Sequence, residues 1–141
     1  MPATEGKVRI TSGAIGELLA HARRDPCVEV CGLLAGHDGV INTVLPAHNV
    51  LASRTAFEIA PAELFTLFRR IREFGLEHAG IYHSHPTGEN APSARDIGHA
   101  FYPALAYFIV SPGGQGARAV RAFAIRGNSA AELPIEVVGL E

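Results

Sequence analysis

The sequence has few charged residues, and its charges nearly cancel. Lys, Arg, Asp and Glu make up 18% of the 141 residues, and the formal net charge is −2. An average globular chain carries roughly 25% charged residues. The small net charge and the lack of any basic run argue against a general nucleic-acid binder.

Long hydrophobic runs are also missing. No segment reaches the roughly 18 uninterrupted apolar residues that a membrane-spanning helix needs. The first residues, MPATEGKVRITSG, lack the apolar stretch of a secretory signal peptide. We therefore expect a protein of the cytoplasm that has no membrane partner.

Cysteine is scarce, with two residues, Cys27 and Cys31. On a strand their Cα atoms would lie about 13 Å apart, whereas a disulfide needs less than about 7 Å. We expect free thiols, which suit a reducing compartment. Cys31 could be a nucleophile, but a small buried apolar residue is the favoured interpretation.

Apolar residues are plentiful, at 48% of the chain, enough for the core of one domain over residues 1–141. Helical spacing of apolar residues predicts a first helix with Ser12 as its N-cap. A turn is expected at 37–39. The order of elements indicates an α/β protein with a mixed sheet flanked by helices, not a doubly wound fold. The predicted helices are 13–24, 61–75 and 93–100, and the predicted strands are 27–36, 40–48, 56–60, 78–85, 105–111, 119–126 and 133–138.

Two histidines lie near the end of the predicted strand 78–85. Side chains alternate along a strand, so His83 and His85 share one face, about 6.6 Å apart along the chain. Two imidazoles at this spacing can lean onto one ion, such as zinc. The pattern by itself leaves open two polar residues at the end of a strand.

Ser93 and Asp96 stand at the start of the predicted helix 93–100. A serine N-cap with an acid in the first turn stabilises a helix start, and the spacing is a variant of the capping box. The same turn could also direct the Asp96 carboxylate at the histidines. The two interpretations are compatible. Three protein ligands leave a fourth position for water, the pattern of catalytic zinc sites.

Glu29 is the only charged residue in the apolar run CVEVCGLLAG, residues 27–36. A buried carboxylate is costly unless it is paired, and such groups cluster at functional sites. Glu29 could lie at an edge or make a satisfied polar contact. It could also be a general base that accepts a proton from metal-bound water and returns it to a leaving amine.

The stretch HSHPTGENAPSARD, residues 83–96, resembles the signature of the JAMM, or MPN-plus, metalloprotease family. That signature is His-x-His-Pro, six residues, then Ser-x-x-Asp. The upstream stretch EVCGLLAG, residues 29–36, matches the family's acid before Cys-Gly-x-Leu. The resemblance extends over roughly residues 8 to 127, and the chain is most similar to the short, stand-alone prokaryotic type.

The resemblance implies a JAMM/MPN-like domain, which is cytidine-deaminase-like in fold. It implies a Zn²⁺ ion held by His83, His85 and Asp96, with water as the fourth ligand. It also implies that Glu29 is the general acid/base. In the same scheme Ser93 donates a hydrogen bond to the developing oxyanion.

The activity implied is that of a zinc peptidase or isopeptidase. Its substrate would be a ubiquitin-like or sulfur-carrier protein ending in Gly-Gly, from which it releases cysteine or a conjugated protein. The carrier tail would bind in an extended form in a groove. The sequence leaves the oligomeric state open.

Two other functions are compatible with the motif. RadC-like proteins, linked to DNA repair, carry a similar signature with a proline before the serine, as Pro92 stands before Ser93 here. The lack of a basic face argues against that function. A module that binds ubiquitin-like proteins without cutting them is disfavoured by the complete ligand set.

Two further polar residues have open roles. His99 follows Asp96 by three residues on the same helix face, and an ordinary surface histidine is favoured over a supporting role at the site. Asn49 could contact the substrate backbone or could form a turn.

Overall fold

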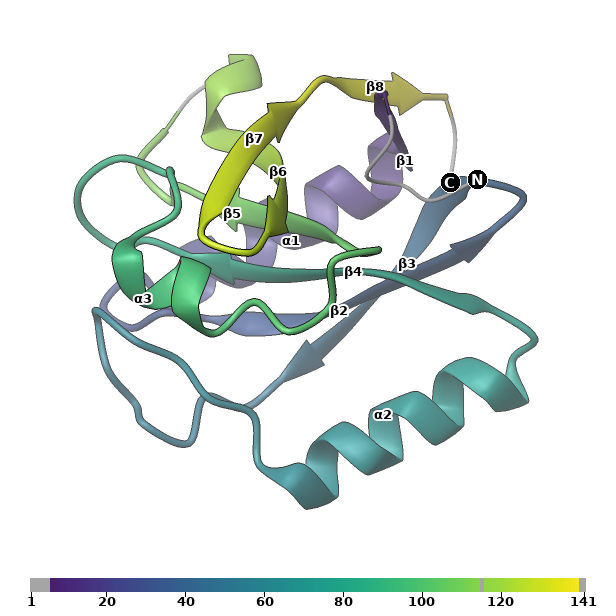
Figure 1. Ribbon diagram of the computed structural model, residues 1–141, viewed down its shortest axis with the longest axis horizontal. Helices are drawn as coiled ribbons and strands as arrows, with labels where there is room; N and C mark the ends of the chain where they lie inside the picture. Colours follow the sequence, from purple (N-terminus) through teal and green to yellow (C-terminus); the bar gives the residue numbers. More distant parts are fainter. Residues whose placement is uncertain (1–5, 115, 140–141) are drawn as a thin grey trace.

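The structure, a computed structural model, describes residues 6–114 and 116–139. Its centre is a mixed eight-stranded sheet with the order β7-β6-β5-β4-β2-β3-β1-β8, and helices pack against it (Figure 1). The α/β class and the flanked mixed sheet are therefore confirmed. The elements are β1 (Val8–Thr11), α1 (Ser12–Arg24), β2 (Cys31–His37), β3 (Val40–Ala47), α2 (Pro61–Glu73), β4 (Glu77–Ser84), α3 (Ala94–Gly98), β5 (Ala106–Val110), a 3₁₀ turn (Gly116–Ala119), β6 (Val120–Arg126), β7 (Ser129–Leu133) and β8 (Ile135–Val138).

The middle of the sheet is formed by β2, β4 and β5. All five residues of β5, AYFIV, are buried, as expected of a strand that is covered on both faces. β4 runs antiparallel to β2 and parallel to β5, so His83 pairs with Cys31 on one side and Ile109 on the other. The end of β4 thus carries His83 in the interior of the sheet.

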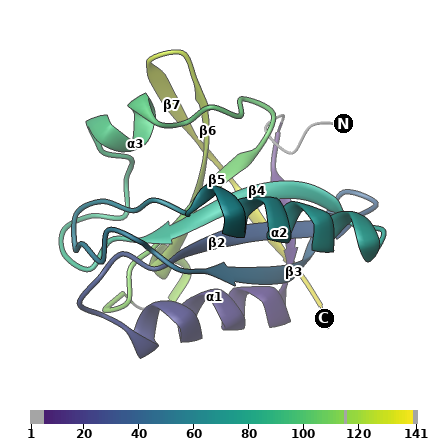
Figure 2. The same cartoon turned by 90° about the horizontal axis from the view of Figure 1, so that it is seen from below.

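Helices α1 and α2 pack on opposite faces of β2. Leu34 belongs to a core cluster with Leu18 of α1, whereas its neighbour Leu33 packs with Leu67 of α2. This is the alternation that a strand imposes on successive side chains. In Figure 2 α1 lies below β2 and β3, and α3 lies above β4, at the end where β4 stops.

The β2–β3 hairpin confirms the turn predicted at 37–39. Its register pairs His37 with Val40, which leaves a two-residue loop of Asp38 and Gly39. Both loop residues have positive φ, 57° and 78°. These values are typical of the type I′ turn, for which Asp-Gly is a preferred pair.

Several predicted boundaries were wrong. The N-cap of α1 is Thr11, whose side chain accepts from the Ala14 amide, and Ser12 is already helical. β2 begins at Cys31, so Glu29 lies just before the strand. No strand forms over 56–60, because the backbone there bonds within its own loop.

Two strands had no clear signal in the sequence. β1 pairs in parallel with β3 and β8, and β7 pairs with β6. The predicted strand 133–138 is in fact divided, with Leu133 ending β7 and Ile135 starting β8. Among the described residues, no helix is long and apolar enough to cross a membrane.

Candidate active site

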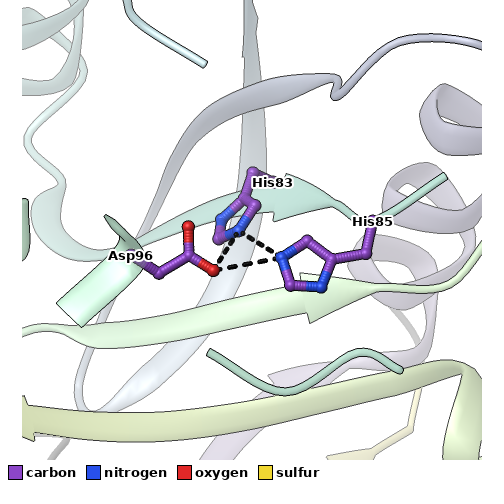
Figure 3. Close-up of side chains that lie close together, drawn as sticks. All are labelled: His83, His85 and Asp96. Atoms are coloured by element: carbon purple, nitrogen blue, oxygen red, sulfur yellow. Dashed lines mark hydrogen bonds and ion pairs between the residues drawn. The ribbon is translucent and has the colours of Figure 1, made fainter. Parts of the chain in front are cut away.

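The side chains of His83, His85 and Asp96 meet at the C-terminal end of β4 (Figure 3). Asp96 Oδ2 lies 3.2 Å from His83 Nε2 and 3.0 Å from His85 Nε2. The two Nε2 atoms are 3.2 Å apart. The structure thus brings together the three residues that the sequence suggested as ligands of one ion.

Asp96 is held in place by the start of α3. Its backbone amide donates to Ser93 Oγ at 3.1 Å, and its carboxylate accepts from the Ser93 amide at 2.9 Å. This reciprocal pair is a capping box. The bond from the Ser93 amide fixes the Oδ2 atom that faces both histidines.

His85 is oriented by the loop that follows it. Its Nδ1 lies 2.8 Å from the carbonyl oxygen of Glu89, so Nδ1–H is the donor in this bond. In the neutral imidazole the proton is then on Nδ1 and the lone pair is on Nε2. A histidine that ligates a metal through one nitrogen usually donates through the other in this way.

The three facing atoms fit a divalent cation. Two imidazole nitrogens and a carboxylate oxygen all carry lone pairs, and they need a proton or a cation between them. Tetrahedral zinc, with bonds of about 2.0–2.1 Å, would place such ligand atoms roughly 3.3 Å apart. The measured separations of 3.0–3.2 Å are close to this value.

The ionisation of these groups in the metal-free protein depends on burial and on their contacts with one another. Burial alone would raise the pKa of Asp96, but its close contacts with His83 and His85 outweigh burial and hold that pKa well below its usual range. Burial lowers the pKa of His83. Although burial also acts on His85, its contacts with Asp96 and Glu89 raise its pKa. The carboxylate is therefore ionised, as a metal ligand must be.

Glu29 interacts electrostatically with His85 and Asp96 and is buried, with 3% of its surface exposed. Its Oε1 atom is buried and has no hydrogen-bond partner among the described residues. Burial raises its pKa to about 7, while His85 acts in the opposite direction. A buried acceptor without a partner is rare in folded proteins and calls for an explanation, such as a catalytic role or a missing ion or water.

The backbone around Glu29 is fixed by other segments. The Glu29 amide donates to the Ser53 carbonyl at 2.8 Å. Next to it, the Val30 amide donates to Ser84 Oγ at 2.9 Å, and the Ser84 amide donates back to the Val30 carbonyl at 3.0 Å. Ser84 lies between the two histidines, so these bonds hold the acid against the end of β4.

The Ser93 hydroxyl can still donate a hydrogen bond. Its hydroxyl oxygen accepts the Asp96 amide, but the hydroxyl group also has a proton to donate. The side chain is exposed to solvent next to the ligand group. The capping role and a donor role toward a substrate are therefore compatible, as the sequence suggested.

A cavity of about 190 Å³ opens beside two of the three clustered side chains, His83 and Asp96. Strand residues Leu33, Ile81 and Ile109 line it, and so do Leu64 and Phe68 of α2. His83 and Asp96 also border the cavity. An apolar hollow bordered by a few polar groups is the usual form of a binding site.

The contact between Phe57 and His83 was not predicted from the sequence. Its ring stacks on the His83 imidazole, with centroids 4.7 Å apart and planes inclined by 24°. Phe57 lies in the region predicted to be a strand, and no pattern of spacing links it to the histidines. Asn49, left open between two roles, is buried and bonds to the same loop and to the Glu29 carbonyl.

The remaining candidates have ordinary roles. Cys31 is buried, and burial raises the pKa of its thiol to about 12. A thiolate nucleophile is therefore disfavoured. Cys27 and Cys31 are both free thiols, as predicted.

His99 is exposed, and its Nδ1 bonds to the Arg95 carbonyl at 2.9 Å. This bond does not involve His83, His85 or Asp96.

The sequence model for prokaryotic homologs of the JAB domain matches residues 11–126. The chain belongs to the prokaryotic JAB family. The match covers both stretches that resemble the JAMM signature, and it confirms the similarity to short prokaryotic proteins of that type.

Individual relatives of the prokaryotic JAB family agree with this assignment. The desampylase of Haloferax volcanii is 39% identical, over 79% of this chain and 86% of that protein. The CysO-cysteine peptidase of Mycobacterium tuberculosis is 30% identical, over 92% of this chain and 90% of that protein. The solution structure of DSY2949 from Desulfitobacterium hafniense, 33% identical, has a TM-score of 0.84 and covers 94% of both chains.

Proposed function

We propose that this protein is a zinc-dependent peptidase of ubiquitin-like or sulfur-carrier proteins. It hydrolyses the bond between the C-terminal glycine of the carrier and the amino acid or protein attached to it. The observation that carries this proposal is the convergence of three ligating atoms beside the buried, unpartnered Oε1 of Glu29. A set of two histidines, one aspartate and a nearby acid suits hydrolysis better than structural zinc binding.

His83, His85 and Asp96 would hold the zinc ion. A bound zinc ion supplies Lewis-acid chemistry, because it polarises a carbonyl oxygen and makes water acidic near neutral pH. Glu29 accepts the proton of the attacking water and delivers it to the leaving nitrogen. In the metal-free protein burial raises its pKa from the ordinary 4.5 to about 7, which favours the uptake of a proton.

Ser93 has a separate task in this mechanism. Its hydroxyl donates a hydrogen bond to the oxygen that gains negative charge as water adds to the scissile carbonyl. The capping bond from the Asp96 amide limits the positions that Ser93 Oγ can take. A donor fixed before the reaction stabilises the developing charge without reorganisation.

The substrate class is supported by the named relatives and by the cavity. A desampylase and a CysO-cysteine peptidase are both similar to this chain over most of its length. The apolar cavity bordered by His83 can hold an extended chain end. Glycines at the end of a carrier would let the backbone approach the zinc ligands closely, since they have no side chain.

A cleavage assay tests the proposal. Small ubiquitin-like carriers ending in Gly-Gly are extended by one cysteine or joined to a lysine side chain, and each is incubated with the zinc-loaded protein. We expect release after the second glycine and full inhibition by a zinc chelator. If no carrier of either type is cut at that bond while zinc is bound, the proposed function is wrong.

A further inference from the structure

The loop between β3 and α2 has no regular secondary structure, yet one side chain in it is fully hydrogen bonded. Asn49 has 7% of its surface exposed. Its Nδ2 donates to the carbonyls of Glu29 and Ala56, each at 2.9 Å. Its Oδ1 accepts from the amides of Leu51 at 3.0 Å and Glu58 at 3.1 Å. The carboxamide therefore uses both its donors and both its acceptor positions.

These four bonds do more than form a turn. The bond to the Leu51 amide is a local one, typical of a turn-forming asparagine. The bonds to Ala56 and Glu58 instead hold the residues on either side of Phe57. The bond to the Glu29 carbonyl reaches a segment twenty residues earlier in the chain. One buried amide thus links the proposed general base to Phe57.

Phe57 in turn restrains a zinc ligand. Its ring covers one face of the His83 imidazole in a stacked arrangement. Rotation of the imidazole about its own bond would break this stacking. Groups that orient a metal ligand in this way commonly change metal affinity or activity when they are replaced.

We propose that Asn49 and Phe57 are positioning residues, with Asn49 fixing Glu29 and Phe57 relative to each other and Phe57 orienting the His83 imidazole toward the metal. The part played by Glu29 rests on the proposed function. The part played by Phe57 requires only that His83 binds a metal.

The Asn49 part is tested with Asn49→Asp and Asn49→Ser. Both can keep the local turn, because Asp and Ser form similar turns. Both lose the N–H donors to Glu29 and Ala56. We expect kcat per zinc-loaded molecule to fall by about 10–100-fold, with KM within about twofold and zinc affinity unchanged. Normal kcat together with a lowered melting temperature would reduce Asn49 to a turn former.

A second measurement on these variants needs no substrate. The Glu29 amide donates to the Ser53 carbonyl, so its hydrogen exchange is slow when this segment is fixed. We expect exchange of the Glu29 amide to accelerate in Asn49→Asp and Asn49→Ser. Unchanged exchange in both variants would contradict the coupling between Asn49 and Glu29.

The Phe57 part is tested by zinc affinity, measured by competition with a chromogenic chelator. Phe57→Leu should weaken zinc binding by about 10-fold or more, whereas Phe57→Tyr, which keeps the ring, should restore it. Phe65→Leu is the matched control, because Phe65 is 64% exposed on α2. The visible absorption of the cobalt-loaded protein should change only in Phe57→Leu. Wild-type zinc affinity in Phe57→Leu would overturn the role of Phe57.

Failure of this inference can be told apart from failure of the proposed function. If the wild-type protein binds zinc but cuts no carrier, the proposed function fails. The zinc-affinity and hydrogen-exchange measurements still decide the roles of Phe57 and Asn49.

Discussion

Ser93 and Asp96 hold each other by two reciprocal hydrogen bonds, with the Asp96 amide donating to Ser93 Oγ and the Ser93 amide donating to Asp96 Oδ2. The same Oδ2 faces both histidines. The same carboxylate oxygen therefore belongs to the helix cap and to the proposed metal site. This explains why two interpretations of the sequence, a capping motif and a catalytic motif, apply to the same four residues.

Substitutions of Ser93 separate its two roles. Ser93→Gly has no side-chain donor but is still a tolerated N-cap, whereas Ser93→Ala has no donor and is a poor N-cap. We expect both variants to lower kcat by about 10²–10³-fold. Only Ser93→Ala should also lose about 1 kcal/mol of stability. Steady-state kinetics and urea unfolding check this, and near-wild-type turnover in Ser93→Gly would remove the oxyanion role.

Glu29→Gln should keep the zinc and lose turnover. Gln has nearly the same shape as Glu but cannot accept the proton, and loss of a general base costs roughly 10²–10⁴-fold. Metal analysis should still give one zinc per chain, because Glu29 is not in the ligand group. Full activity in this variant would show that the assignment of the base is wrong.

The raised pKa of Glu29 predicts how the metal-free protein responds to pH. The folded-state pKa is about 7 and the ordinary value is 4.5, so the folded state favours the protonated carboxyl. The contribution of this carboxyl to the free energy of unfolding is fully present below its ordinary pKa of 4.5. That contribution is lost as the pH rises through about 7. The loss corresponds to about 3 kcal/mol.

Urea unfolding of the chelator-treated protein tests whether stability falls as the pH rises. Between pH 5 and pH 8, the wild type should lose stability relative to Glu29→Gln, which has no carboxyl to ionise. Glu73→Gln, at an exposed position on α2, is the control and should follow the wild type. Parallel pH curves for wild type and Glu29→Gln would contradict the buried state of the carboxyl.

Removal of one ligand should abolish zinc binding. His85→Ala deletes a nitrogen that lies 3.0 Å from Asp96 Oδ2. We expect no stoichiometric zinc after dialysis and no rise in melting temperature when zinc is added. His37→Ala, at an exposed position in the hairpin, should bind zinc as the wild type does. One equivalent of zinc retained by His85→Ala would exclude His85 from the site.

Modification of the cysteines distinguishes a metal-dependent hydrolase from an enzyme with a cysteine nucleophile. Cys27 is exposed and Cys31 is buried with a raised thiol pKa. Iodoacetamide should therefore modify Cys27 in the native protein, leave Cys31 intact, and leave carrier cleavage unchanged. Mass spectrometry and the cleavage assay measure this together. Inactivation that accompanies modification of Cys31 would favour a cysteine nucleophile over a metal site.

The sequence predicted that His83, His85 and Asp96 lie together, from local rules combined with the resemblance to the JAMM signature. Strand alternation places His83 and His85 on one face, and a helix start after a short loop returns Asp96 toward them. The strand predicted at 105–111 and the turn predicted at 37–39 also follow from local signals, and both are confirmed, the strand as Ala106–Val110.

Contacts between distant segments were not predictable in the same way. Strand β1 has only four residues, and its partners lie at Val40 and beyond, so no local pattern reveals the pairing. The segment 56–60 has the composition of a strand, but Asn49 takes up its backbone groups. A polar residue in a loop gives no signal of such bonds, and the roles of Asn49 and Phe57 therefore required the structure.

The most direct test of the central claim is the mass of the carrier released in oxygen-18-labelled water. Hydrolysis by the zinc-loaded protein should give a carrier that ends at its second glycine and carries one heavy oxygen atom in the new carboxylate. The same product should be absent after zinc chelation and with zinc-loaded Glu29→Gln. A cut at another bond, a product without the label, or the same product from the chelated protein would contradict the account.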